Sequence, residues 1–113
     1  MNGTSSIPWH QYALIVYTAQ QLGSSNLGKT AMQKLVYLIQ ELGGVPVEYR
    51  FHFYNYGPYS SNLAGDLDFV NALQGIKITY DSSLNMYNIG VGEKARALIE
   101  KAGDFLDRYA EEI

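Results

Sequence analysis

The chain has 113 residues, of which 47% are hydrophobic and 17% charged, and it contains ten tyrosines and no cysteine. This length fits a single domain with one core, and the high hydrophobic content excludes a disordered chain. Without cysteine there are no disulfides and no thiolate metal sites, and a formal net charge of −3 with no basic run disfavours strong nonspecific binding to nucleic acid.

Two amphipathic helices are predicted first along the chain. Pro8 marks the start of the first helix, which is expected to stop at Gly23. The second helix is expected to begin at Thr30, because Thr30 and Gln33 fit a capping box, and to end at Gly43. The residues that follow the helical pattern are Trp9, Tyr12, Ala13, Val16, Ala19 and Gln20 in the first helix and Met32, Leu35, Val36, Ile39 and Leu42 in the second.

An aromatic strand is predicted next. Polar and aromatic residues alternate from residue 48 to residue 54, which is the period of a half-buried strand. Tyr49, Phe51 and Phe53 share one side of this strand, and we expect that side to face the core.

A rigid corner follows the strand. Gly57 permits an unusual backbone conformation and Pro58 fixes one dihedral angle, so these residues should end the strand. Because strand side chains alternate and the chain turns here, the rings of Tyr54, Tyr56 and Tyr59 cannot all lie in one layer. We expect some of these rings to be exposed, and the alternative, in which they pack inward with only their hydroxyls in water, stays open.

A short third helix and a hairpin come next. Ser60 or Ser61 can cap the helix, which Gly75 should close. Two β-prone runs, residues 76–80 and 86–89, are joined by a turn-rich spacer and predict a β-hairpin.

A long last helix is predicted from about Gly92. Its apolar stripe consists of Ala95, Leu98, Ile99, Ala102, Phe105, Leu106 and Tyr109. Three helices followed by a hairpin are the layout of a winged-helix domain. We therefore expect one α+β domain over residues 1–113, winged-helix-like and mainly helical, with a short strand and a β-hairpin wing.

Residues 23–30, GSSNLGKT, match the P-loop pattern GxxxxGK[ST], in which backbone amides and a lysine hold phosphates. A true P-loop follows a buried strand, whereas this stretch follows a predicted helix. The favoured interpretation is a helix end at Gly23, a turn at Gly28 and a helix cap at Thr30, so no cofactor is expected.

The third helix is the element that would read DNA in a winged-helix layout. Its polar side chains include Ser60, Ser61 and Asn62, but Asp66 and Asp68 would repel phosphates. Phosphate contacts would have to come from basic residues elsewhere, namely Lys29, Lys34, Arg50, Lys77 and Lys94. DNA binding is therefore the alternative function rather than the favoured one.

The sequence contains no recognisable catalytic or metal-binding pattern. His10 and His52 lie on different predicted elements, outside any His/Asp/Ser or metal-ligand spacing. Asp104, Asp107 and Glu111 line one face of the last helix, which is typical of a solvated surface. We expect a protein without enzymatic activity.

Two motifs resemble a known family. Residues 33–40, QKLVYLIQ, and residues 51–60, FHFYNYGPYS, resemble the YwgA-like proteins and, more distantly, the SocA-like antitoxin (Panacea) domains, which share a K-L-x-Y-x-x-Q helix and a Y-G-P turn. The similarity covers about residues 29–99. It implies a prokaryotic cytoplasmic protein of helix-turn-helix-like build, and the antitoxin relatives act by contact with a protein client. The resemblance carries over no catalytic residue.

The predicted client-binding surface combines both motifs. Lys34, Tyr37 and Gln40 follow one edge of the second helix, beside the corner that carries the three tyrosines Tyr54, Tyr56 and Tyr59. Tyrosine is enriched at interface hot spots, and exposed tyrosines also favour a homodimer. The apolar stretches are too short to span a bilayer and residues 1–10 lack signal-peptide features, so we expect no membrane partner.

Overall fold

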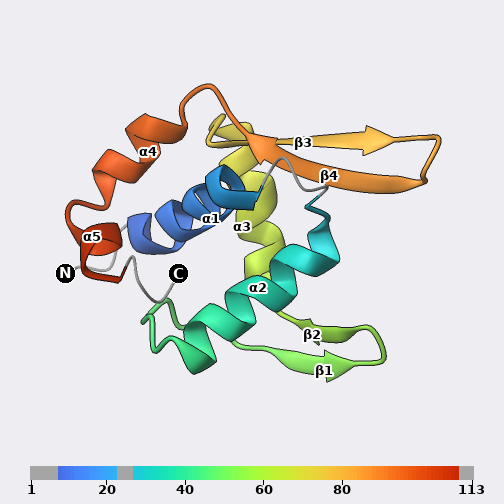
Figure 1. The fold of residues 1–113 in the computed structure, drawn as a ribbon, viewed down its shortest axis with the longest axis horizontal. Helices are drawn as coiled ribbons and strands as arrows, with labels where there is room; N and C mark the ends of the chain where they lie inside the picture. Colours follow the sequence, from blue (N-terminus) through green and yellow to red (C-terminus); the bar gives the residue numbers. More distant parts are fainter. Residues whose placement is uncertain (1–7, 23–26, 110–113) are drawn as a thin grey trace.

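The computed structural model describes residues 8–22 and 27–109 (Figure 1). Its elements in chain order are α1 (Trp9–Leu22), α2 (Lys29–Leu42), β1 (His52–Tyr54), β2 (Gly57–Tyr59), α3 (Ser61–Ala72), β3 (Ile76–Asp81), β4 (Met86–Val91), α4 (Ala95–Lys101) and α5 (Phe105–Tyr109). The fold is α+β, as expected, with two small antiparallel hairpins. No helix within the described ranges is long and apolar enough to cross a membrane.

The core is built around α1. Every residue from Tyr12 to Val16 is buried, so this helix is covered on more than one side. The predicted stripe is correct only in part, because Gln20 is exposed, whereas Leu14 and Ile15 lie outside the stripe and are fully buried. The other helices and the β3–β4 hairpin all pack against α1, which leaves it little exposed surface.

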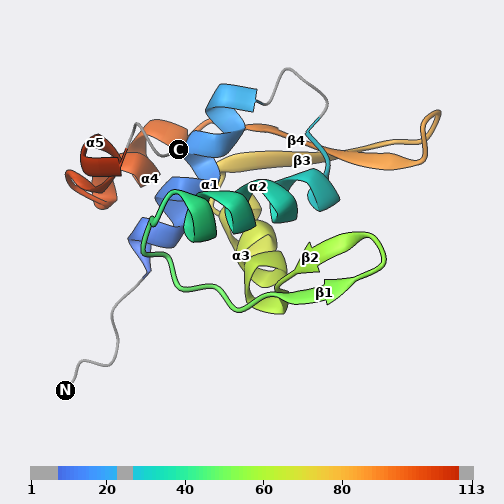
Figure 2. The ribbon, with the colours of Figure 1, turned by 60° about the horizontal axis from the view of Figure 1, so that its bottom comes forward.

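The two hairpins project from the same end of the helical body, on either side of α2 (Figure 1, and turned in Figure 2). In the first hairpin His52 pairs with Tyr59. The second hairpin is attached to the segment just before α2, because the Ile89 N–H donates to the Leu27 carbonyl at 2.7 Å. The N-terminal half of α2 therefore lies between the two hairpins.

Several local predictions are confirmed. The Ser60 hydroxyl caps α3 by accepting the Leu63 N–H at 3.2 Å. Gly43 is the C-cap of α2, and the β-hairpin predicted after the third helix is the pair β3–β4. The predicted end of the first helix at Gly23 lies outside the described residues.

The predicted helix cap at Thr30 is wrong. α2 begins at Lys29, with Gly28 as its N-cap and no side-chain cap bond. Thr30 is exposed, and the Gln33 side chain bonds to the backbone of Ser60 instead. A pair of long-range hydrogen bonds thus replaces the local pair that the capping box predicted.

The predicted aromatic strand is shorter than expected, and it lies outside the core. Only His52–Tyr54 forms a strand, and this strand pairs only with β2. Tyr49 is buried and Phe51 half-buried, but Phe53 is 67% exposed and not in the core. The Tyr37 ring of α2 contacts Phe53 but leaves most of its surface exposed.

The predicted long last helix is divided into two. α4 ends at Lys101 and α5 begins at Phe105. Between them Gly103 has a φ of +65°, a conformation that favours glycine and commonly ends a helix. Members of the predicted stripe on both sides of the break, such as Leu98 and Phe105, are still buried.

Candidate functional site

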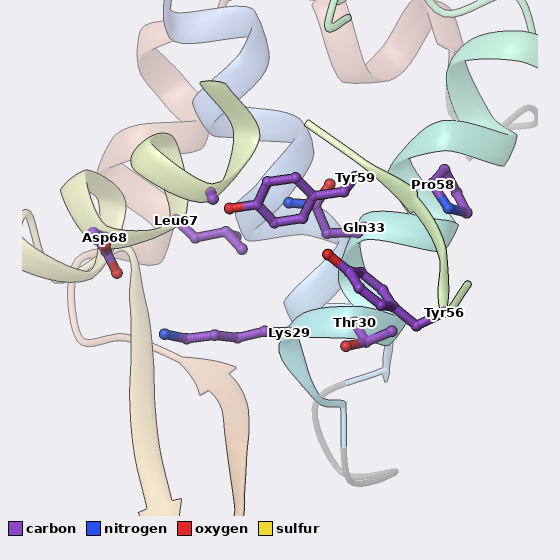
Figure 3. Close-up of a pocket in the computed structure, with 9 residues that line it drawn as sticks. Lys29, Thr30, Gln33, Tyr56, Pro58, Tyr59, Leu67 and Asp68 are labelled. Carbon is purple, nitrogen blue, oxygen red and sulfur yellow. The ribbon is translucent and has the colours of Figure 1, made fainter. Parts of the chain in front are cut away.

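A cleft of about 380 Å³ lies between α2, α3 and the β1–β2 hairpin (Figure 3). We call it the tyrosine cleft, and it is lined by Lys29, Thr30, Gln33, Tyr56, Pro58, Tyr59, Ala64, Leu67 and Asp68. Figure 3 shows the rings of Tyr56 and Tyr59 beside one another, with their hydroxyls directed into the cleft. Lys29 and Asp68 approach its far end from α2 and α3. The lining therefore combines apolar surface, hydroxyls and one charge of each sign.

Three tyrosines of the hairpin form one group beside this cleft. The rings of Tyr54 and Tyr56 stack with centroids 5.6 Å apart and planes 9° apart. Tyr54 also meets Tyr59 edge to face, with centroids 6.0 Å apart. Tyr54 is 52% exposed and Tyr56 is 54% exposed, which confirms the expectation that some of these rings are accessible.

Two glutamines of α2 fix both ends of the segment that carries the tyrosines. The Gln33 side-chain amide donates to the Ser60 carbonyl at 3.0 Å and accepts the Ser60 N–H at 2.8 Å. The Gln40 amide donates to the Tyr49 carbonyl at 2.8 Å and accepts the Tyr49 N–H at 2.7 Å. These residues lie about two helical turns apart, so both face the same segment. We call the two pairs of bonds the glutamine clamps.

The Tyr49 side chain adds a link to α3. Its hydroxyl donates to the Asp66 carboxylate at 2.5 Å. Burial, and then the bond to Asp66, raises the pKa of Tyr49 well above its usual range. Burial raises the pKa of Asp66, although the bond from Tyr49 acts in the opposite direction. The start of the hairpin segment is thus held by α2 through its backbone and by α3 through a side chain.

The hairpin turn depends on glycine, which gives a testable prediction. Gly57 has a φ of +119°, and a Cβ atom there would lie 2.9 Å from Lys34 Cε. Replacing Gly57 by valine should lower the free energy of unfolding by about 1–2 kcal/mol, measured by thermal denaturation. Gly65→Val is the control, because a Cβ at this exposed position in α3 would meet no atom within 4 Å. An unchanged melting temperature for Gly57→Val would contradict the prediction.

The predicted client-binding residues lie on different faces of the hairpin. Tyr54, Tyr56 and Tyr59 come together on the cleft side of the hairpin, as described above. Tyr37 is half-buried and contacts the Phe53 ring edge to face, with centroids 5.3 Å apart. Phe53 alternates with Tyr54, so Tyr37 lies on the opposite face of the hairpin.

The two other predicted contacts from α2 differ in their access to a partner. Lys34 is exposed and lies beside Gly57 at the hairpin turn. Gln40 is half-buried and uses its amide inside the fold, in the second glutamine clamp. Lys34 is therefore free to contact a partner, whereas Gln40 positions the hairpin.

Among the predicted DNA-contacting residues Ser60 is not accessible, and two of the lysines line different hollows. Ser60 is fully buried and its hydroxyl is the cap of α3, so its side chain cannot reach a phosphate. Lys77 lies at a hollow formed with the end of α3, whereas Lys29 lines the tyrosine cleft. The remaining candidates, Arg50, Ser61 and Asn62, are exposed.

The histidines and carboxylates stay apart within the described residues. His10 stacks on Phe105, with centroids 4.4 Å apart, and His52 is exposed on β1. Residues 8–22 and 27–109 contain no group of three His, Cys, Asp or Glu side chains that could hold a metal ion. Asp104 forms an exposed ion pair with Arg108 at 3.6 Å. Asp107 is exposed, and Glu111 lies outside the described residues.

Sequence reasoning missed the clamp role of Gln33 and the place of Asp68 in the cleft. A usable signal existed for Gln33, which follows Met32 on the buried side of α2. A polar side chain in such a position usually has a hydrogen-bond partner. No comparable signal existed for Asp68, because its position depends on how α3 packs beside α2.

Comparison with known proteins gives no match to a family model, to a curated protein or to a solved structure. The resemblance to the YwgA-like and antitoxin families therefore stays a prediction. The functional interpretation depends on the geometry of the tyrosine cleft and on the residues that hold it.

Proposed function

We propose that this chain is a non-enzymatic protein-interaction module that binds an extended segment of a protein client at the tyrosine cleft. The observation that carries the proposal is the accessible stack of Tyr54 and Tyr56 beside the cleft, on a hairpin fixed at both ends. Aromatic rings held in place before binding supply contact area while little conformational freedom is lost. Gln33 and Gln40 supply this preorganisation, because their clamps fix the backbone on both sides of the rings.

The proposal includes a cytoplasmic, antitoxin-like adaptor of winged-helix-like build. The order of α1, α2, α3 and the β3–β4 wing supports this, as do the K-L-x-Y-x-x-Q and Y-G-P motifs. The β1–β2 hairpin is then an addition to the winged-helix layout, placed between its second and third helices. It is this addition that carries the tyrosines.

DNA binding is the second candidate, supported by the same order of helices and wing. It is less well supported, because Ser60 is buried and Asp68 lies in the cleft beside Lys29. Asn71 on α3 is also occupied, since its side-chain oxygen accepts the Ile78 N–H at 2.9 Å. The third helix thus offers few free polar groups for base contacts.

Affinity capture from a native lysate tests the proposal, with and without nuclease treatment. We expect Tyr56→Ser to weaken client binding by about 30-fold, the effect of losing a hot-spot residue. Leu42→Ser is the control for the loss of an exposed apolar side chain, because Leu42 is 81% exposed and lies at the C-terminal end of α2, outside the lining of both hollows. Equal client binding by Tyr56→Ser and the unchanged chain would overturn the proposal. Capture that disappears after nuclease treatment would favour DNA binding.

A further inference from the structure

We propose that the client segment is acidic and that it passes from the tyrosine cleft, over the first turn of α2, into a second hollow beside β4. This inference rests on the proposed function and adds the charge and path of the partner. A second hollow of about 510 Å³ is lined by Lys29, Thr30, Ala31 and Lys34 of α2 and by Met86 and Tyr87 of β4. We call it the lysine groove.

The lysine groove and the tyrosine cleft share two lining residues, Lys29 and Thr30. The first turn of α2 therefore borders both hollows, and the two hairpins lie on either side of this helix (Figure 2). An extended segment lying across this turn would touch both hairpins at once. It would meet aromatic side chains at both ends of its path, namely Tyr56 on one side and Tyr87 on the other.

The charge of the lysine groove determines the chemistry of its partner. Its charged lining residues are Lys29 and Lys34, and no carboxylate lines it. Within the described residues neither lysine has an acidic side chain within 4.0 Å, and the first turn of α2 contains no acidic residue. Asp and Glu side chains would therefore complement this groove. The exposed parts of Met86 and Tyr87 can pack against an apolar residue next to such a carboxylate.

A peptide fits this surface better than single-stranded nucleic acid does. Nucleic acid binding would need open ring faces for base stacking and several cations for the phosphates. Here Tyr54 and Tyr56 stack on each other, and Lys29 Nζ lies 4.2 Å from the centroid of the Tyr87 ring.

Selection from a random dodecapeptide phage library on the full chain tests this inference. We expect the selected peptides to contain more Asp and Glu than the input library, next to aromatic or apolar residues. The Lys29→Glu/Lys34→Glu variant should lose this acidic excess. Lys94→Glu is the control for a general charge effect, because Lys94 is exposed and lies at the start of α4.

Fluorescence anisotropy then measures the affinity of a selected synthetic peptide and of the oligonucleotide dT12. We expect Lys29→Gln/Lys34→Gln to weaken peptide binding about tenfold, and added salt to weaken it as well. Tighter binding of dT12 than of the peptide would overturn the inference in favour of nucleic acid.

Two further outcomes separate this inference from the proposed function. Peptides that need Tyr56 but show no acidic excess and no response to the lysine substitutions would overturn the acidic partner and leave the client-binding function standing. A selection that gives no peptide dependent on Tyr56 would overturn both.

Discussion

Replacing Gln33 by leucine is expected to lower the free energy of unfolding by about 1.5–4.5 kcal/mol. Gln33 is only 4% exposed and Ser60 is fully buried, so the Ser60 N–H would lose its partner without gaining access to water, whereas the Ser60 carbonyl would keep its bond from the Ala64 N–H. The orphaned N–H costs about 1–3 kcal/mol and the bond lost at the carbonyl about 0.5–1.5 kcal/mol, and leucine supplies apolar volume but no hydrogen bond. Urea denaturation monitored by circular dichroism measures the change.

Gln20→Leu is the matched control for the Gln33 substitution. Gln20 lies on α1 and is exposed, so the same chemical change there should alter stability by less than about 0.5 kcal/mol. A loss below about 1 kcal/mol for Gln33→Leu would mean that the first glutamine clamp is not a structural requirement. Where the variant remains folded, its client affinity should also fall, because the end of the hairpin at Ser60 would no longer be fixed.

The clamp shows why local patterns could predict the elements but not the site. Ser60 is one of the two caps that the sequence predicts for the third helix, and its partner, the Leu63 N–H, is only three residues away. Gln33 also fits a local motif, but its actual partner is 27 residues away in sequence. The long-range bonds satisfy a buried backbone N–H and carbonyl, whereas the N–H groups at the start of a helix can be satisfied by water. No local pattern indicates that competition.

Alternation in the aromatic strand predicted which side chains share a face, but not which face is covered. The side chains of Val45, Val47 and Tyr49 are buried at every second position before the strand, so the period was real. Phe53 continues it and is exposed, because by that point the chain has left the helical body. The break at Gly103 was visible as a glycine, but the apolar stripe continues past it and favoured one long helix.

The exposed tyrosines were predictable from the sequence, whereas the lysine groove was not. Alternation and the Gly57 turn indicate that the rings of Tyr54, Tyr56 and Tyr59 cannot all lie in one layer, which favours the exposure of some of them. The groove requires β4 to lie beside the start of α2, which is fixed by the bond from Ile89 to Leu27. That contact joins segments separated by α2, the β1–β2 hairpin, α3 and β3, so only the tertiary structure reveals it.

Replacing Tyr49 by phenylalanine is expected to lower the free energy of unfolding by about 1.5–3 kcal/mol at pH 7, because the bond to the Asp66 carboxylate is lost. The loss should depend on pH in a defined direction. The pKa of Tyr49 is raised in the folded state, so its contribution is complete below the unfolded value near 10 and is lost as the pH rises above it. The difference between the two proteins should therefore shrink by about 1.4 kcal/mol per pH unit above pH 10.

The acid side of the same profile follows from Asp66. Burial raises the pKa of this carboxyl and the Tyr49 hydroxyl opposes the rise, so Tyr49→Phe should raise the pKa further. A raised carboxyl pKa gives stability that is present at low pH and lost as the pH rises through the folded value. The variant should therefore gain more stability than the unchanged chain when the pH falls from 7 to 4, and the difference between them should be largest near neutral pH.

Urea denaturation from pH 4 to pH 11 measures this profile, with Tyr54→Phe as the control. Tyr12, whose pKa is also raised by burial and by Asp66, is present in every protein compared, so its titration largely cancels in the differences. Tyr54 is exposed, so Tyr54→Phe should follow the same pH profile as the unchanged chain. A difference between Tyr49→Phe and the unchanged chain that stays constant with pH would show that the hydroxyl is not bonded to the carboxylate. The start of the hairpin would then be fixed to α2 alone, and Tyr49→Phe should leave client affinity unchanged.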